Sequence, residues 1–123
     1  MSGWLSGPRE TIMMPMSAPP ADFFDSDLSS LTWLQGWYMS NCDGDWEHGY
    51  GVAIETLDNP GWMVRLELTG TPLDGRTFER FEYQRDEHDW LQMWLEDGAL
   101  RVACGPLNLS EGLFRFREWA QQR

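Results

Sequence analysis

The sequence predicts an α+β fold in a single domain, with an antiparallel sheet of about five strands flanked by an N-terminal and a C-terminal helix. Two observations predict the sheet. Apolar and polar residues alternate over 50–56 and 62–69, and the β-rich runs 90–95 and 99–104 flank an Asp-Gly turn. A third observation predicts the helices, because apolar residues recur at helical spacing on either side of this region. A chain of 123 residues is long enough to bury an ordinary core without metal or disulfide bonds.

The first part of the chain differs in composition from the rest. Residues 1–27 combine prolines and methionines with small polar residues, and show neither helical nor strand periodicity. We therefore expect 1–27 to form a flexible N-terminal lead and 28–123 to form the folded domain.

The first predicted helix follows this lead. Asp27, Ser29 or Ser30 is expected to cap it, and it is expected to end by Asn41 because turn residues follow. Its apolar residues recur at i, i+3 and i+7, with two tryptophans forming an adjacent ridge, so the helix has a wide apolar face: Leu31, Leu34, Tyr38, Trp33 and Trp37.

The strands follow as two hairpins and a single strand. The runs 50–56 and 62–69 are joined by a turn in which Pro60 is expected at the first turn position and Gly61 where φ must be positive. A third strand is predicted over 78–85, and the runs 90–95 and 99–104 form the second hairpin.

The last predicted element is a helix that Asn108 or Ser110 caps. Its apolar face consists of residues at i, i+4, i+7 and i+11: Leu109, Leu113, Phe116 and Ala120.

The charge of the chain restricts its partners. The formal net charge is −11 at pH 7, and all nine basic side chains are arginines. A negative field of this size repels phosphate backbones and anionic lipids, so we expect no nucleic acid and no membrane surface as a partner. A basic protein is the expected partner, and the absence of an apolar span or a secretion signal from the sequence predicts a cytoplasmic location.

An acidic loop rich in aromatic residues is the first candidate for a binding site. Asp43, Asp45, Glu47 and His48 surround Trp46. These residues lack the regular ligand positions of a calcium loop and the complete ligand set of a zinc site, so no metal and no other cofactor is predicted. Because eight tryptophans are many for a core of this size, we expect one or two indoles at the surface, with Trp46 first and then Trp90 and Trp94.

Catalytic machinery is not evident in the sequence. There is no Gly-x-Ser-x-Gly motif, no phosphate-binding loop and no dinucleotide fingerprint, so no catalytic residue is predicted and the protein is not expected to be an enzyme. Two alternatives stay open. A small hydrolase would need Cys42 or His48 in a cleft, and a ligand-binding accessory module would show a deep apolar pocket lined by Trp90 and Trp94.

Several long motifs resemble the immunity protein 53 family of bacterial polymorphic toxin systems. They are Leu31-Thr32-Trp33-Leu34-Gln35-Gly36-Trp37-Tyr38, Cys42-Asp43-Gly44-Asp45-Trp46-Glu47-His48-Gly49-Tyr50-Gly51-Val52 and Thr56-Leu57-Asp58-Asn59-Pro60-Gly61-Trp62, and the similarity extends over roughly residues 30 to 120. The resemblance implies a small immunity protein that binds a co-produced toxin domain and blocks it. It implies no catalytic residue, no cofactor and no particular contact residue.

Charge and resemblance together predict how the partner is bound. An acidic domain with aromatic and carboxylate side chains on its surface suits a basic toxin, such as a nuclease. The hypothesis is that Asp43, Asp45 and Glu47 attract the toxin and that Trp46 is the buried anchor of the interface. The alternative is that Trp46 is a core residue, in which case Trp46→Ala would lower stability by itself.

Overall fold

The computed structural model describes residues 19–122 and confirms the predicted α+β fold. Three helices and five strands follow one another along the chain as α1 (Pro19–Asn41), α2 (Trp46–Gly49), β1 (Val52–Leu57), β2 (Gly61–Glu67), β3 (Phe81–Asp86), β4 (Asp89–Glu96), β5 (Ala99–Cys104) and α3 (Leu109–Ala120).

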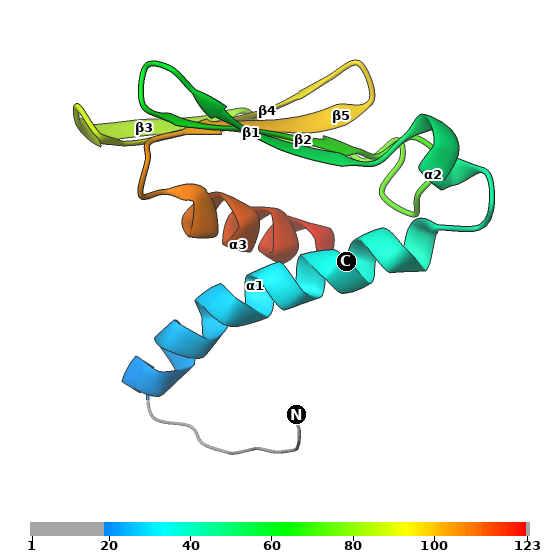
Figure 1. The fold of residues 1–123 in the computed structure, drawn as a ribbon, viewed down its shortest axis with the longest axis horizontal. Helices are drawn as coiled ribbons and strands as arrows, with labels where there is room; N and C mark the ends of the chain where they lie inside the picture. Colours follow the sequence, from blue (N-terminus) through cyan, green and yellow to red (C-terminus); the bar gives the residue numbers. More distant parts are fainter. Residues whose placement is uncertain (1–18, 123) are drawn as a thin grey trace.

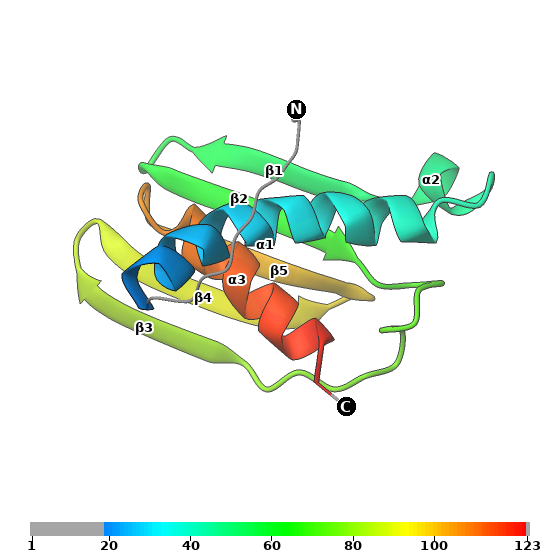
Figure 2. The same ribbon diagram turned by 90° about the horizontal axis from the view of Figure 1, so that it is seen from below.

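The five strands form one antiparallel sheet in the order β1-β2-β5-β4-β3. Figure 1 shows the sheet as one layer and α1 and α3 as the other, with α2 beyond one end of the sheet. Seen from below in Figure 2, α1 and α3 cross over the same face of the sheet. The opposite face carries no helix among residues 19–122.

The core lies between the sheet and the two long helices. Alternate residues of the central strands face the helices and are at most 1% exposed: Val64, Leu66, Leu91, Met93, Leu100 and Val102. Phe116 of α3 is fully buried against them, and the rings of Trp33 and Trp37 on α1 meet it edge-on at centroid distances of 5.6 and 5.2 Å. Burial of these apolar and aromatic side chains is the main stabilisation of the fold.

The boundaries of several elements differ from those predicted. The strands predicted over 50–56, 62–69 and 90–95 run over Val52–Leu57, Gly61–Glu67 and Asp89–Glu96. Helix α1 begins at Pro19, so residues 19–27 of the predicted lead are helical. Prolines are tolerated in the first turn of a helix, where the amide hydrogens have no intrahelical partner, and acidic residues favour that end. Residues 1–18 lie outside the described part, and the predicted division at residue 27 stays a prediction. Strand β3 begins at Phe81, which pairs with Met93, rather than at residue 78, and the ring of Phe78 packs against Trp119 at 5.4 Å.

The predicted reason for Gly61 is wrong. Gly61 is the first residue of β2 and does not have a positive φ. A Cβ atom at this position would lie 2.3 Å from the carbonyl oxygen of Cys104 on β5 and 3.3 Å from the ring of Trp90. The position needs glycine because of this close approach of strands and indole. No helix within residues 19–122 has the length and apolar character to cross a membrane.

Candidate functional site

The acidic loop is held in one shape by its own carboxylates. Asp43 Oδ1 accepts hydrogen bonds from the backbone N–H groups of Asp45 and Trp46, both at 2.9 Å. Glu47 reaches back and accepts from the N–H groups of Asp43 at 2.9 Å and Gly44 at 2.8 Å. This reciprocal arrangement, which resembles a capping box, satisfies the backbone amide hydrogens of the turn that leads into α2.

These hydrogen bonds also keep the loop charged. Backbone N–H groups, first that of Trp46 and then that of Asp45, hold the pKa of Asp43 below its ordinary value. The pKa of Glu47 is lowered by hydrogen bonds from the backbone amides of Glu47 itself, Asp43 and Gly44. Both carboxylates are therefore ionised at neutral pH and fixed in position. Within residues 19–122, no three His, Cys, Asp or Glu side chains are grouped so that they hold a metal ion.

The expected surface position of Trp46 is wrong. Its side chain is 6% exposed, its Nε1–H donates to the carbonyl oxygen of Thr69 at 2.9 Å, and its ring meets that of Trp37 edge-on at 6.1 Å. The indole projects from the short helix α2, which the sequence analysis missed, and lies between α1 and the loop that follows β2. Trp46 is therefore a core residue of this connection, as the alternative reading had it.

Two tyrosines on either side of Trp46 are exposed instead. Tyr38 of α1 lies 5.8 Å from the indole and is 39% exposed, and Tyr50 stacks on the indole at 6.4 Å and is 43% exposed. Asp43 and Asp45, in the loop between them, are exposed, and Glu47 is half-buried. We call Tyr38, Asp43, Asp45, Glu47 and Tyr50 the tyrosine–carboxylate surface. His48 is exposed beside it on α2.

Trp90 and Trp94 lie elsewhere, on the sheet face without helices. They alternate along β4 with the core-facing Leu91 and Met93, and both are half-buried. The guanidinium of Arg80 lies 5.2 Å from the ring of Trp94, whose Nε1–H donates to Glu96 at 2.9 Å. Six of the seven predicted site residues therefore fall on two separate surfaces, and the seventh, Trp46, lies in the core.

A groove of about 1270 Å³ lies between β3 and α3, with Phe78, Phe81, Phe114 and Trp119 among its lining rings. Trp90 and Trp94 do not line this groove. Cys42 and His48 are not in the groove either. The Cys42 thiol donates to the carbonyl oxygen of Tyr38 at 3.3 Å, and His48 is exposed on α2.

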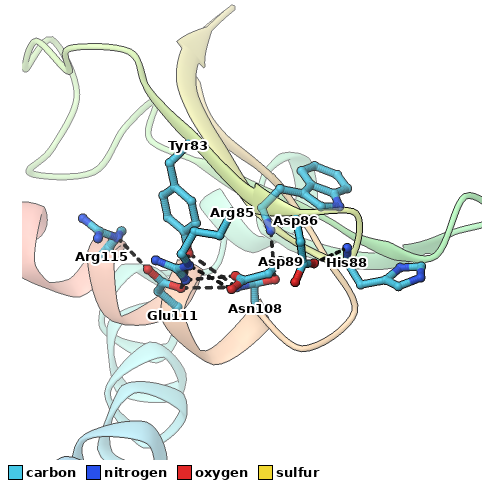
Figure 3. Close-up of polar contacts among 9 residues, drawn as sticks. Tyr83, Arg85, Asp86, His88, Asp89, Asn108, Glu111 and Arg115 are labelled. Atoms are coloured by element: carbon cyan, nitrogen blue, oxygen red, sulfur yellow. Dashed lines mark hydrogen bonds and ion pairs between the residues drawn. The ribbon is translucent and has the colours of Figure 1, made fainter.

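One end of the groove contains a polar cluster that the sequence analysis missed (Figure 3). Arg85 of β3 donates two hydrogen bonds to Asp89 at 2.8 and 2.9 Å. Asn108 donates to Asp89 at 2.9 Å and accepts from the backbone N–H of Trp90 at 3.3 Å. Asn108 precedes α3 as predicted, but its side chain makes no cap bond and joins the helix to the β3–β4 hairpin instead.

Tyr83 and Glu111 complete this cluster. The phenol of Tyr83 donates to Glu111, and Arg115 donates to the same carboxylate at 3.3 Å. Desolvation, together with the neighbouring Glu111, raises the pKa of Tyr83 to about 12, so the phenol keeps its proton at neutral pH. The members of the cluster satisfy one another, and the cluster therefore braces β3 and β4 against α3.

This brace should make folding sensitive to acid. Hydrogen bonds from Arg85 and Asn108 lower the pKa of Asp89. Partial burial opposes ionisation of Glu111, but hydrogen bonds from Tyr83, Asn108 and Arg115 lower its pKa overall. Because these groups bind protons more weakly in the folded state, their stabilisation is present above the ordinary carboxyl pKa of about 4 and is lost as the pH falls through the lowered values. Urea unfolding between pH 7 and pH 3 should show this loss.

Glu111→Gln is the matched control for this prediction, since it keeps an acceptor but cannot titrate. The decrease in unfolding free energy on acidification should be smaller for the variant than for the natural protein. An equal decrease in both would contradict a stabilising role for ionised Glu111.

Comparison with known proteins places this geometry in a family. Residues 31–121 match the family model described as Immunity protein 53, a range that includes all five strands, α2, α3, the tyrosine–carboxylate surface and the polar cluster. No curated protein and no solved structure matched the chain. The chain belongs to the Immunity protein 53 family.

Proposed function

We propose that this protein confers immunity by binding a cognate toxin domain directly, through the tyrosine–carboxylate surface. Membership of an immunity protein family implies a protein toxin as the partner. The net charge of −11 favours a basic toxin, and nucleases are one such class because they must bind phosphate.

The observation that carries this proposal is the pair of exposed tyrosines supported by a buried indole. Tyr38 and Tyr50 both pack on Trp46, so their rings are positioned before any partner arrives. Tyrosine has few rotatable bonds and offers a large contact area with a polar tip, which is why it is enriched among residues that dominate binding energy. Little conformational entropy remains to be lost when such a surface is covered.

The carboxylates give the same surface a negative charge. Asp43 and Glu47 are held by backbone hydrogen bonds, and Asp45 lies between them. Charges at an interface mainly accelerate association and select the partner, while desolvated aromatic groups slow dissociation. The proposed surface therefore separates into carboxylates that set the association rate and tyrosines that set the lifetime.

Tyr38→Ala and Tyr50→Ala should each weaken toxin binding by about 1–2 kcal/mol, mainly through faster dissociation. Asp45→Asn should instead slow association, and this effect should shrink as the salt concentration rises, because salt screens exposed charges. Surface plasmon resonance with the co-encoded toxin domain measures both rates.

Glu87→Gln is the control for the loss of one negative charge. Glu87 is exposed in the β3–β4 turn, at the end of the sheet away from α2 (Figure 1). Its replacement should leave both rates near those of the natural protein. A role for Trp90 and Trp94 in binding stays a prediction. If Trp94→Ala weakens the complex and the tyrosine variants do not, the sheet face binds the toxin and the tyrosine–carboxylate surface does not.

A further inference from the structure

The two edge strands of the sheet differ in how they are protected against pairing with another chain. β1 and β3 are the outer strands. The register of β3 against β4 shifts between Gln84 and Asp86, and most of the β3 side chains are exposed and polar or charged. Bulges and charged side chains are features by which natural edge strands avoid unwanted partners.

β1 has no bulge and only one charged side chain. Its sequence, Val-Ala-Ile-Glu-Thr-Leu, contains no proline and only Glu55 as a charged residue. It pairs with β2 without a register shift from Val52↔Leu66 to Leu57↔Gly61. A regular and weakly charged edge of this kind is a template for an added strand.

The hydrogen-bonding groups on the free side of β1 follow from its register. Gly51 O accepts from Glu67 N at 3.1 Å, so Gly51 and Glu67 form a hydrogen-bonded pair at the start of the ladder. In an antiparallel ladder such pairs alternate with non-bonded ones, so Ala53 and Glu55 direct their amides to β2. The amides of Val52, Ile54 and Thr56 therefore point away from the sheet.

The surroundings of this edge suit a basic strand. Ile54 is 39% exposed, although its pairing with the core residue Val64 places it on the helix side of the sheet. The start of β1 adjoins Tyr50 and the carboxylates Asp43, Asp45 and Glu47, and Glu55 lies within the strand. An added strand with basic side chains would find opposite charge, a partly exposed isoleucine and a row of backbone groups that have no partner among residues 19–122.

We infer that the toxin contributes an extended basic segment that pairs with β1 as a sixth strand of the sheet. This inference rests on the proposed function and specifies how the proposed surface holds its partner. The tyrosine–carboxylate surface continues directly into β1 through Gly51, so a single bound segment reaches both. A second copy of this chain is a poorer occupant, because each copy carries a net charge of −11.

Amide hydrogen exchange, followed by NMR on the isotope-labelled full chain with and without the co-encoded toxin domain, tests the inference residue by residue. Val52, Ile54 and Thr56 should exchange at least about tenfold more slowly in the complex, because strand addition supplies acceptors for their N–H groups. Ala53 and Glu55 are already bonded to β2 and should change less. Unchanged exchange at Val52, Ile54 and Thr56 in a formed complex would overturn the inference.

Thr56→Pro and Thr56→Val form a matched pair for the same question. Proline removes an outward N–H that β2 does not use, whereas valine keeps the N–H and changes only the side chain. Thr56→Pro should weaken toxin binding by about tenfold and Thr56→Val should not. Equal affinities of the two variants would count against an added strand, and thermal melts of both variants show whether proline has disturbed the fold.

The outcomes separate this inference from the proposed function. If the tyrosine variants weaken binding but the β1 amides are unaffected, the toxin binds at the tyrosine–carboxylate surface without adding a strand, and only the inference is lost. If the toxin does not bind at all, both are wrong. If the β1 amides are protected without toxin and the protein sediments as a dimer, a second copy occupies the edge and the inference is overturned.

Discussion

Trp46→Ala is expected to lower the free energy of unfolding by about 3–5 kcal/mol, the range for removal of a buried aromatic ring from a packed site. The indole is 6% exposed and lies among the rings of Trp37, Tyr38 and Tyr50. Its removal leaves a cavity between α1, α2 and the loop after β2, and also leaves the carbonyl oxygen of Thr69 without its donor. Urea unfolding of the natural protein and the variant measures the difference.

Trp46→Phe separates the two contributions. Phenylalanine keeps most of the ring packing but removes the hydrogen bond to Thr69, so its cost should be smaller, about 1–2 kcal/mol. Toxin binding by the Trp46→Ala variant can contradict this core role of Trp46. A Trp46→Ala variant of natural stability that dissociates faster from the toxin would restore the indole as the interface anchor.

Gly61→Ala is expected to destabilise the fold by about 3 kcal/mol, because overpacking against backbone cannot be relieved by a rotamer change. The added methyl group would lie 2.3 Å from the carbonyl oxygen of Cys104, at one end of the β2–β5 ladder, and 3.3 Å from the Trp90 ring. Either β2 and β5 move apart or the ladder loses hydrogen bonds at this end. Thermal and urea unfolding report the loss.

Gly36→Ala is the control, since the same substitution should have the opposite sign there. Gly36 lies inside α1, and a Cβ at that position would meet nothing within 4 Å. Alanine in an exposed helix interior is favoured over glycine by about 0.5–1 kcal/mol, so this variant should be more stable than the natural protein. Equal effects of the two substitutions would show that conformational preference, and not the approach of Cys104, governs Gly61.

Local sequence was sufficient to predict the five strands and the two long helices, but not the short helix α2. The alternation in β1 and β2, the Asp-Gly turn between β4 and β5 and the 3.6-residue spacing in α3 each involve residues close together in the chain. Because the physical causes of these elements are local, their number, type and order were predictable. The family was also predictable from local sequence, because the long motifs that indicate it lie in the α1–β2 part of the chain.

The candidate site depended on contacts between residues far apart in the sequence. Trp46 was predicted at the surface because its neighbours are acidic, yet its indole binds Thr69, and the tyrosines on either side of it carry the exposed surface. Asn108 has the residue type and position of a helix cap, but Asp89 and Trp90 occupy its side chain. Gly61 stands in a sequence typical of a turn, but a side chain is excluded there because the carbonyl oxygen of Cys104 is too close.

The sequence by itself determined the α+β class, the five strands, the two long helices, the strong negative charge and the membership of an immunity family. Only the tertiary structure decided which aromatic rings are exposed, which carboxylates are bonded within the protein and which edge strand is unprotected. The physical reason is that periodicity and turn chemistry act over a few residues, whereas burial and hydrogen-bond pairing depend on segments that meet only when the sheet and helices pack together.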